Sequence, residues 1–355
     1  MSYNLLKGKK GLIFGALNED SIAWKVAERA VEEGAEIVLT NTPVSIRMGT
    51  INQLAEACGA IVVPADATSV PDLENLIEKT MEHFGGKFDF ILHSIGMSPN
   101  VRKGRTYDDL DYDFLTKTLD ISAISFHKVI QVARKKDALN DWASIVALSY
   151  IAAQRTLYGY NDMADAKALL ESIARSFGYI YGREKFVRIN TVSQSPTPTT
   201  AGKGVLGMGD LMDYADRNSP LGNATADDCA GYVLTLFSDL TRKVTMQNLF
   251  HDGGFSSMGM SRRAMTLYEK GLEVEYQDLS KRSESFPESV NKKCTVQGTV
   301  HFFIFIIAVG RPVTLAGCAE QPFYCASFQS SVRNGNAGSP PVLYSVVWSG
   351  TLRNA

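Results

Sequence analysis

Short, continuous apolar stretches alternate with amphipathic stretches from the start of the chain to about residue 260. Within 21–33, for example, Ile22, Val26 and Ala30 recur at helical spacing and form one apolar face. The apolar stretches predict strands at 10–15, 36–40, 60–64, 88–92, 143–148, 186–190 and 248–251. The amphipathic stretches predict helices at 21–33, 51–58, 70–84, 115–134, 160–181 and 226–237. This alternation predicts an α/β fold, a doubly wound parallel sheet of about seven strands with a ligand crevice at the carboxyl ends of the strands.

The alternation of apolar and amphipathic stretches is lost after about residue 285. Segment 291–355 has no clear hydrophobic period, and its C-terminal sequence is rich in Gly, Ser, Asn and Pro. It also contains the uncharged, β-prone run 302–307. We therefore expect a single domain over 1–262, a C-terminal extension over 263–290 and an atypical, poorly ordered tail over 291–355. We interpret the tail as an appendage, such as run-on coding sequence.

Composition excludes several classes of function. The net charge is −2, with 45% hydrophobic and 21% charged residues, which is typical of a soluble protein and does not favour nucleic acid or an anionic membrane as partner. The five cysteines are scattered without a CxxC pair, so we expect no disulfide scaffold and no metal site, which fits a reducing cytoplasm. The longest apolar run, 302–309, is far shorter than the roughly 20 residues of a membrane-spanning helix.

The turn after the first strand is the first candidate for ligand binding. Gly15 permits a tight turn, and Ser21 and Ile22 open the following helix, where a phosphate-binding loop of a Rossmann-like sheet lies. The turn lacks the GxGxxG pattern. An ordinary strand end followed by a helix that Ser21 caps explains the same residues equally well.

The ends of the second and third strands supply further candidates. No acidic residue follows strand two, so Asn41 or Thr42 is left to bind a ribose, and Arg47 is the nearby cation for a 2′-phosphate. NADH is therefore favoured over NADPH, which stays possible. Asp66, followed by Ala67, is placed to reach an adenine amino group, although a turn aspartate that caps the next helix is the alternative.

Loops after strands four and six complete the predicted crevice. Gly96, in the motif 93–97, allows the backbone to approach a cofactor closely, and we interpret the neighbouring His93 as structural. The loop 193–200 contains Pro196, which fixes its path, and Thr197, which offers polar groups to a carboxamide or phosphate. A turn with two prolines is the alternative interpretation of that loop.

A tyrosine and a lysine seven residues apart carry the predicted chemistry. Tyr160 and Lys167 are close to two helical turns apart, which places them on one helix face, and Tyr150 lies ten residues upstream. A phenol can hydrogen-bond an oxygen that gains negative charge, while an ammonium lowers the pKa of the phenol and holds a cofactor hydroxyl. Tyr181 and Lys185 also form a Tyr-x3-Lys pair, but they lie at the opposite end of the sheet, and we treat that pair as coincidence.

Together these motifs resemble the bacterial enoyl-acyl-carrier-protein reductases, a divergent branch of the short-chain dehydrogenase/reductases. The resemblance runs from about residue 7 to 260. It rests on Gly15-x5-Ser21-Ile22-Ala23, Asp66, His93-Ser94-Ile95-Gly96, Leu148-Ser149-Tyr150, Tyr160-x6-Lys167, Arg188-Ile189-Asn190 and His251-Asp252-Gly253-Gly254-Phe255. It implies a cytoplasmic, Rossmann-fold homotetramer that uses NADH to reduce trans-2-enoyl thioesters on acyl carrier protein in fatty acid biosynthesis.

The resemblance also implies roles for single residues. Tyr160 hydrogen-bonds the thioester oxygen as it becomes an enolate, Lys167 binds the nicotinamide ribose, and Tyr150 lines the acyl site. The cofactor-binding residues that it implies, together with those placed by the strand ends, are Gly15, Ser21, Ile22, Thr42, Asp66, Ala67, Ser94, Ile95, Gly96, Lys167, Pro196 and Thr197.

The chain departs from the family pattern at several positions. Tyr158 precedes the active-site tyrosine where the family often has proline, so it is a second candidate phenol. Gln194 and the residue after it replace the small residues of the loop that contacts the nicotinamide. Asp162 and Asp165 flank the site and are expected to face solvent. Two other functions remain open: a short-chain dehydrogenase acting on a carbonyl or alcohol, and a dinucleotide-binding regulator without catalysis.

Overall fold

A seven-stranded parallel sheet forms the centre of the compact unit over residues 1–273. The structure is a computed structural model that describes residues 2–199 and 208–283, with side chains up to residue 272. Residues 1–273 form one compact unit. The strands are β1 Lys10–Phe14, β2 Glu36–Thr40, β3 Ile61–Val62, β4 Phe88–His93, β5 Leu139–Ser149, β6 Arg188–Gln194 and β7 Asn248–His251. Their order is β3-β2-β1-β4-β5-β6-β7, which confirms the predicted Rossmann-like, doubly wound sheet.

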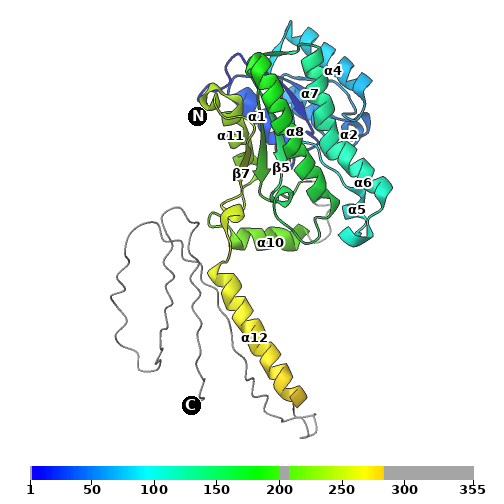
Figure 1. Cartoon of the computed structure of the whole chain (residues 1–355). Coiled ribbons are helices and arrows are strands. Elements are labelled where there is room, and N and C mark those ends of the chain that lie inside the picture. Colours follow the sequence, from blue (N-terminus) through cyan, green and yellow to red (C-terminus); the bar gives the residue numbers. More distant parts are fainter. Residues whose placement is uncertain (1, 200–207, 284–355) are drawn as a thin grey trace, which may run out of the picture. The chain divides into compact units, whose positions relative to one another are not determined.

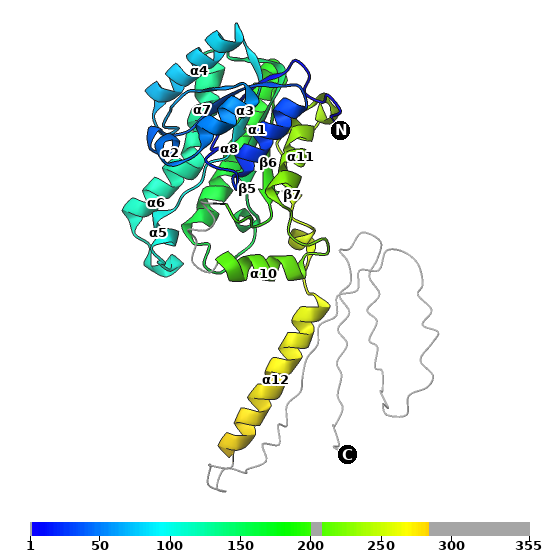
Figure 2. The same cartoon turned by 180° about the vertical axis from the view of Figure 1, so that it is seen from behind.

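Helices cover both faces of this sheet (Figure 1). The described residues as a whole form the helices α1 Ile22–Glu32, α2 Pro43–Met48, α3 Ile51–Cys58, α4 Val70–Phe84, α5 Pro99–Arg102, α6 Tyr112–Leu119, α7 Ser125–Lys135, α8 Asp162–Lys185, α10 Met208–Asn218, α11 Ala226–Phe237 and α12 Arg262–Ser283, not all of which lie on the sheet. One apolar core lies between the sheet and α4, α7 and α8, and the second lies under α1, α3 and α11, which Figure 2 shows from behind. In β1, Leu12 and Phe14 belong to the first core and Ile13 to the second, as the two-residue period of a strand requires.

The helix predicted over 115–134 is interrupted. The segment Asp120–Ile124, between α6 and α7, is a π-helical turn. Just after it, Ser125 donates a hydrogen bond of 2.7 Å to the Ile121 carbonyl. Before it, the Thr118 hydroxyl shares its single proton between the Phe114 carbonyl and Asp162, both at 2.8 Å. Hydroxyls that bond back to carbonyls four residues earlier compete with the regular helical ladder. The sequence pattern gave no sign of this interruption, nor of the short helices α2 and α5.

The described residues contain no helix that is long and apolar enough to cross a bilayer. Within the same residues no group of three or more His, Cys, Asp or Glu side chains is arranged to hold a metal ion. The extension predicted over 263–290 coincides in part with α12. The tail predicted over 291–355 lies outside the described residues, so the boundaries at 262 and 290 stay predictions.

Candidate active site

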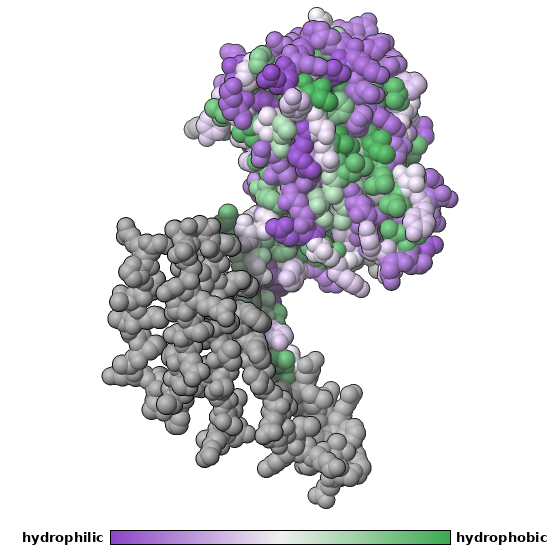
Figure 3. Space-filling view, in the orientation of Figure 1, coloured by the Kyte–Doolittle hydropathy of each residue, from purple (hydrophilic) through white to green (hydrophobic). Residues whose placement is uncertain are grey.

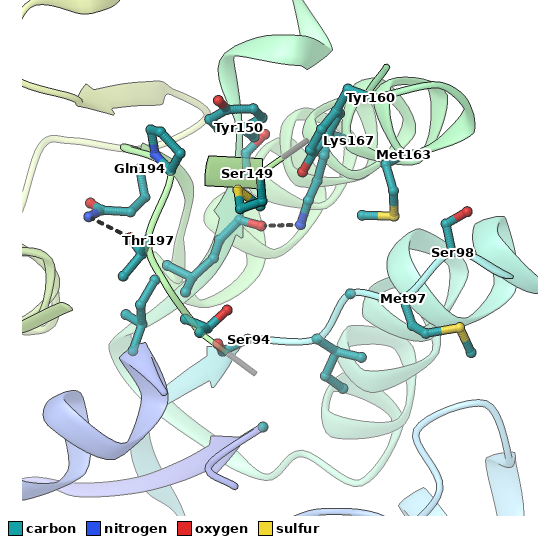
Figure 4. Close-up of a pocket in the computed structure, with 18 of the residues that line it drawn as sticks. Ser94, Met97, Ser98, Ser149, Tyr150, Tyr160, Met163, Lys167, Gln194 and Thr197 are labelled. Atoms are coloured by element: carbon teal, nitrogen blue, oxygen red, sulfur yellow. Dashed lines mark hydrogen bonds between the residues drawn. The ribbon is translucent and has the colours of Figure 1, made fainter. Parts of the chain in front are cut away.

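A pocket opens at the carboxyl ends of β1, β4, β5 and β6 (Figure 4). Its walls come from the turns after β1 and β4, the end of β5, the start of α8, the loop after β6 and part of α10. The predicted site residues that line it are Gly15, Ser21, Ile22, Ser94, Ile95, Gly96, Tyr150, Tyr160, Lys167, Pro196 and Thr197. The strand-end argument therefore brings most of the candidates into one place.

The turns after β1 and β4 meet with their backbones in contact. Gly15 has φ +94°, and a Cβ built on it would lie 2.0 Å from the Ser94 carbonyl oxygen. Only glycine fits this position, because a side chain there would be both strained and obstructed. The predicted need for glycine at this turn thus has a specific cause, the close approach of the neighbouring loop.

Ser21 acts on the turn rather than on the helix that follows. Its hydroxyl accepts hydrogen bonds from the backbone N–H groups of Leu17 and Asn18, both at 3.2 Å, and makes no cap bond to α1. The interpretation of Ser21 as a side-chain cap is therefore wrong. Ser21 and Ile22 line the pocket at the N-terminus of α1, where free backbone N–H groups and the helix dipole suit the pyrophosphate of a dinucleotide.

Lys167 reaches the pocket from α8. It is 7% exposed, and its Nζ donates a hydrogen bond of 2.7 Å to the Leu148 carbonyl at the end of β5. A Cβ at Gly96 would lie 3.7 Å from this Nζ, so the loop after β4 passes directly over the ammonium. Burial lowers the pKa of Lys167 to about 8, and the Glu171 carboxylate, one helical turn further on, opposes that shift.

Tyr160 does not share a helix face with Lys167, so that part of the spacing argument is wrong. α8 begins at Asp162, after a turn in which Gly159 has φ +80° and Asn161 has φ +46°. The turn, and not the helical period, brings the phenol to the pocket. There its ring lies 4.8 Å from that of Tyr150, centroid to centroid.

The two pocket tyrosines are protonated phenols at neutral pH. Burial raises the pKa of Tyr160 and that of Tyr150 well above the ordinary value of 10.0. The expectation that the Lys167 ammonium lowers the pKa of Tyr160 is thus wrong in this structure, because desolvation dominates. The Tyr150 hydroxyl is buried without a hydrogen-bond partner among the described residues. Tyr158, the second candidate phenol, is fully exposed and does not line the pocket.

Three predicted cofactor residues lie outside the pocket lining. Thr42 accepts a hydrogen bond of 3.2 Å from the Ser45 N–H as the cap of α2. Asp66 accepts bonds from the N–H and the hydroxyl of Thr68, at 2.9 and 2.8 Å. Ala67 packs into the core beside α4. Each has a local structural role, and a contact with a cofactor stays a prediction for these three.

Other lining residues were not named individually as site residues. They are Leu17, Met97, Ser98, Val101, Arg102, Met163, Met208 and Leu211. Most belong to α5, α10 or the loop before α5. α5 has only four residues, too few to show a helical period. Leu17, Met97 and Met163 nevertheless lie within the predicted motifs. Met208 and Leu211 fall in the segment 199–216, which the family resemblance places over the substrate.

Asp162 is the clearest error of the sequence interpretation. It was expected to face solvent, yet it is 0% exposed and accepts hydrogen bonds from Ser98, Asn100 and Thr118. Asp165 is partly exposed and accepts a bond from the Tyr107 hydroxyl.

The second tyrosine–lysine pair lies at the opposite end of the sheet from the pocket, as predicted. Tyr181 is buried in the core under α8, and Lys185 donates to the Leu139 carbonyl at 2.7 Å. Leu139 is the first residue of β5, whereas the pocket lies at the other end of that strand.

Comparison with known proteins identifies the family. A family model described as enoyl-(acyl carrier protein) reductase matches residues 15–256. A curated NADH enoyl-acyl-carrier-protein reductase of Rickettsia bellii is 34% identical over 74% of this chain and 99% of its own length. A second, from Rhizobium meliloti, is 30% identical over 72% of this chain and 94% of its own.

Solved structures give the same result. The FabI–NADH complex from Alistipes finegoldii is 89% identical, with a TM-score of 0.74, over 76% of this chain and 95% of the solved one. A second FabI structure from that organism is 86% identical, with a TM-score of 0.73, over 77% of this chain and 100% of the solved one. With the fold, the pocket and the family match in agreement, this chain belongs to the enoyl-acyl-carrier-protein reductase family.

Proposed function

We propose that this protein reduces the trans-2 double bond of enoyl thioesters on acyl carrier protein, with NADH as reductant, in fatty acid biosynthesis. The observation that carries the proposal is the meeting of Tyr150, Tyr160 and Lys167 in the pocket at the carboxyl edge of the sheet. Membership of the reductase family and the NADH complex of the Alistipes finegoldii relative support it.

The residues present fit a dinucleotide. The N-terminus of α1 offers N–H groups to a pyrophosphate, and Gly15 and Gly96 leave room where side chains would intrude. Lys167 uses one N–H on the Leu148 carbonyl and keeps two for the ribose hydroxyls of the nicotinamide half. Bound NADH supplies the hydride, which goes to the β-carbon of the enoyl group.

Tyr160 stabilises the charge that develops on the substrate. Its raised pKa keeps the phenol protonated, so it donates a hydrogen bond to the thioester oxygen as that oxygen becomes an enolate. Lys167 holds positive charge nearby. Tyr150, whose ring packs against that of Tyr160, lines the acyl site and limits water around the oxygen.

We further propose that the protein is a cytoplasmic homotetramer. On the face covered by α7 and α8, hydrophobic side chains gather at the surface (Figure 3). Tyr179 is 64% exposed and Ile180 40% exposed on α8, and Ile124 lies exposed just before α7. Packing against a second copy would bury them. Ile180→Lys is expected to dissociate the oligomer in light scattering, whereas Leu240→Lys, at an exposed site on another element, is not.

The loss of NADH absorbance with a crotonyl thioester tests the activity. We expect the crotonyl thioester to be reduced with NADH, and more slowly with NADPH. No NADH oxidation is expected with an acetoacetyl thioester. Oxidation with the β-keto substrate alone would assign the protein to carbonyl reduction instead. Absence of activity with both substrates, but with intact NADH binding, would favour the non-catalytic regulator.

Tyr160→Phe tests the assigned phenol. Removing one donor from a developing oxyanion commonly costs about 100- to 1000-fold in kcat. NADH affinity should stay near that of the wild type. Tyr158→Phe, two residues away but fully exposed, is the matched control and should leave turnover unchanged. A Tyr160→Phe variant with normal turnover would move the role to Tyr150.

A further inference from the structure

A buried carboxylate lies directly behind the pocket, at the first residue of α8. Asp162 is 0% exposed and is two residues after Tyr160. Its Oδ1 accepts a hydrogen bond of 2.6 Å from the Ser98 hydroxyl. Its Oδ2 accepts bonds from Asn100 at 2.9 Å and from Thr118 at 2.8 Å. In the described part of the chain, hydrogen bonds rather than an ion pair balance this charge, and the N-terminus of α8 favours it.

The three donors come from segments that are far from Asp162 in the sequence. Ser98 lies in the loop after β4 and also caps α5, Asn100 belongs to α5, and Thr118 belongs to α6. Asn100 is itself locked in place, because its amide accepts a bond of 3.0 Å from the Asp111 N–H and donates one of 3.1 Å to the Asp111 carbonyl. The carboxylate therefore joins the segment 98–118 to the start of α8.

This junction lies between two walls of the pocket. On one side, Ser98 lines the pocket, and the preceding Met97 is held by Ser122, whose hydroxyl bonds both the N–H and the carbonyl of Met97 at 3.0 Å. On the other side, the turn that carries Tyr160 enters α8 through Asn161, whose amide donates to the Arg105 carbonyl. Figure 4 shows Ser98, Met97, Met163 and Tyr160 around the same side of the pocket.

A buried carboxylate without a cation is a poor means of stabilising a fold, since its desolvation offsets much of what its hydrogen bonds contribute. Such groups instead fix one arrangement of the segments that they join. The segments joined here are the loop after β4 and the turn that carries Tyr160. In the proposed reaction these hold the cofactor and the phenol, respectively.

We propose that Asp162 is a positioning residue, which fixes the Tyr160 turn against the loop after β4 so that the phenol meets the thioester oxygen. The inference rests on the proposed function, but not on any contact of Asp162 with substrate. Asp162 acts through the backbone of its own turn and through Ser98. Its loss is expected to lower kcat more than it raises the KM for either substrate.

The test compares three variants of the full chain. Asp162→Ala removes the acceptor and is expected to lower kcat about 10- to 100-fold, as small misplacements of reacting groups do. Asp162→Asn keeps one acceptor oxygen for Asn100 and Thr118 and should recover most of this loss. Asp165→Ala, at a partly exposed aspartate on the same helix, is the matched control and should leave kcat unchanged.

Circular dichroism, NADH titration and steady-state kinetics are measured on each variant. The proposal is overturned if Asp162→Ala lowers the melting temperature but leaves kcat of the folded enzyme unchanged, or if it changes kcat no more than Asp165→Ala. If Asp162→Ala does not fold, Thr118→Val, which deletes a single donor, must still lower kcat with the KM values unchanged. If the wild-type protein were inactive on the crotonyl thioester, the proposed function itself would be refuted, whatever the kinetic constants of the variants.

Discussion

Replacement of Gly15 by alanine measures how tightly the turns after β1 and β4 are packed. The left-handed φ of +94° costs an alanine about 1–2 kcal/mol. The new Cβ would also lie 2.0 Å from the backbone oxygen of Ser94, and relieving such an overlap typically costs about 1–3 kcal/mol more. The expected loss of stability is therefore about 2–5 kcal/mol.

Gly59→Ala is a matched control. Gly59 ends α3 with φ +62°, and a Cβ there would meet nothing within 4 Å, so only the backbone cost of about 1–2 kcal/mol applies. For a domain of this size 1 kcal/mol corresponds to about 2–4 °C in melting temperature. Thermal unfolding should therefore fall clearly further in Gly15→Ala than in Gly59→Ala, and NADH affinity should fall in Gly15→Ala alone. Equal losses in the two variants, with equal NADH affinity, would show that the close approach to Ser94 has no energetic consequence.

Three further predictions concern titration and the C-terminal segment. kcat/KM should fall as the pH rises through about 8, where Lys167 loses its proton. Lys167→Arg should abolish this alkaline decline because arginine stays charged, and a decline that persists in the variant contradicts the assignment. Burial lowers the pKa of His93 from 6.5 to about 3, so between these values the unfolded chain binds a proton that the folded chain does not, and stability falls as the pH falls. His93→Gln should flatten this loss in acid unfolding followed by circular dichroism, and an unchanged acid slope would argue against it. A chain that ends at residue 285 should retain crotonyl-thioester turnover. A folded but inactive truncation would show that the removed residues, 286–355, are more than an appendage.

The sequence predicted the sheet and most of the pocket because both depend on local patterns. Strands such as β1 and β2 are buried on both faces and read as continuous apolar runs. Once the strands are placed, topology brings the residues that follow them, such as Gly15, Ser94 and Thr197, to one edge. No knowledge of side-chain contacts was needed for that step.

The errors arose where contacts between distant segments decide the outcome. Asp162 looks like an exposed helical aspartate, and its donors lie 44 to 64 residues away in the sequence. Tyr160 was predicted to be helical, but α8 begins two residues later, at Asp162. The positive φ of Asn161, the residue before α8, is not visible in the hydrophobic periodicity. The burial that raises the pKa of Tyr160 likewise depends on the assembled pocket.

The position of Tyr160 outside α8 affects how this site can be transplanted or redesigned. The separation of phenol and ammonium is set by the bend at 159–161 and not by the rise of a helix. A graft of α8 alone would carry Lys167 into a new scaffold and leave the tyrosine without a defined place. The smallest transferable unit therefore comprises 157–167 together with the 98–118 segment that supports it. An inserted or deleted residue at 159–161 would move the Tyr160 phenol while leaving Lys167 in place.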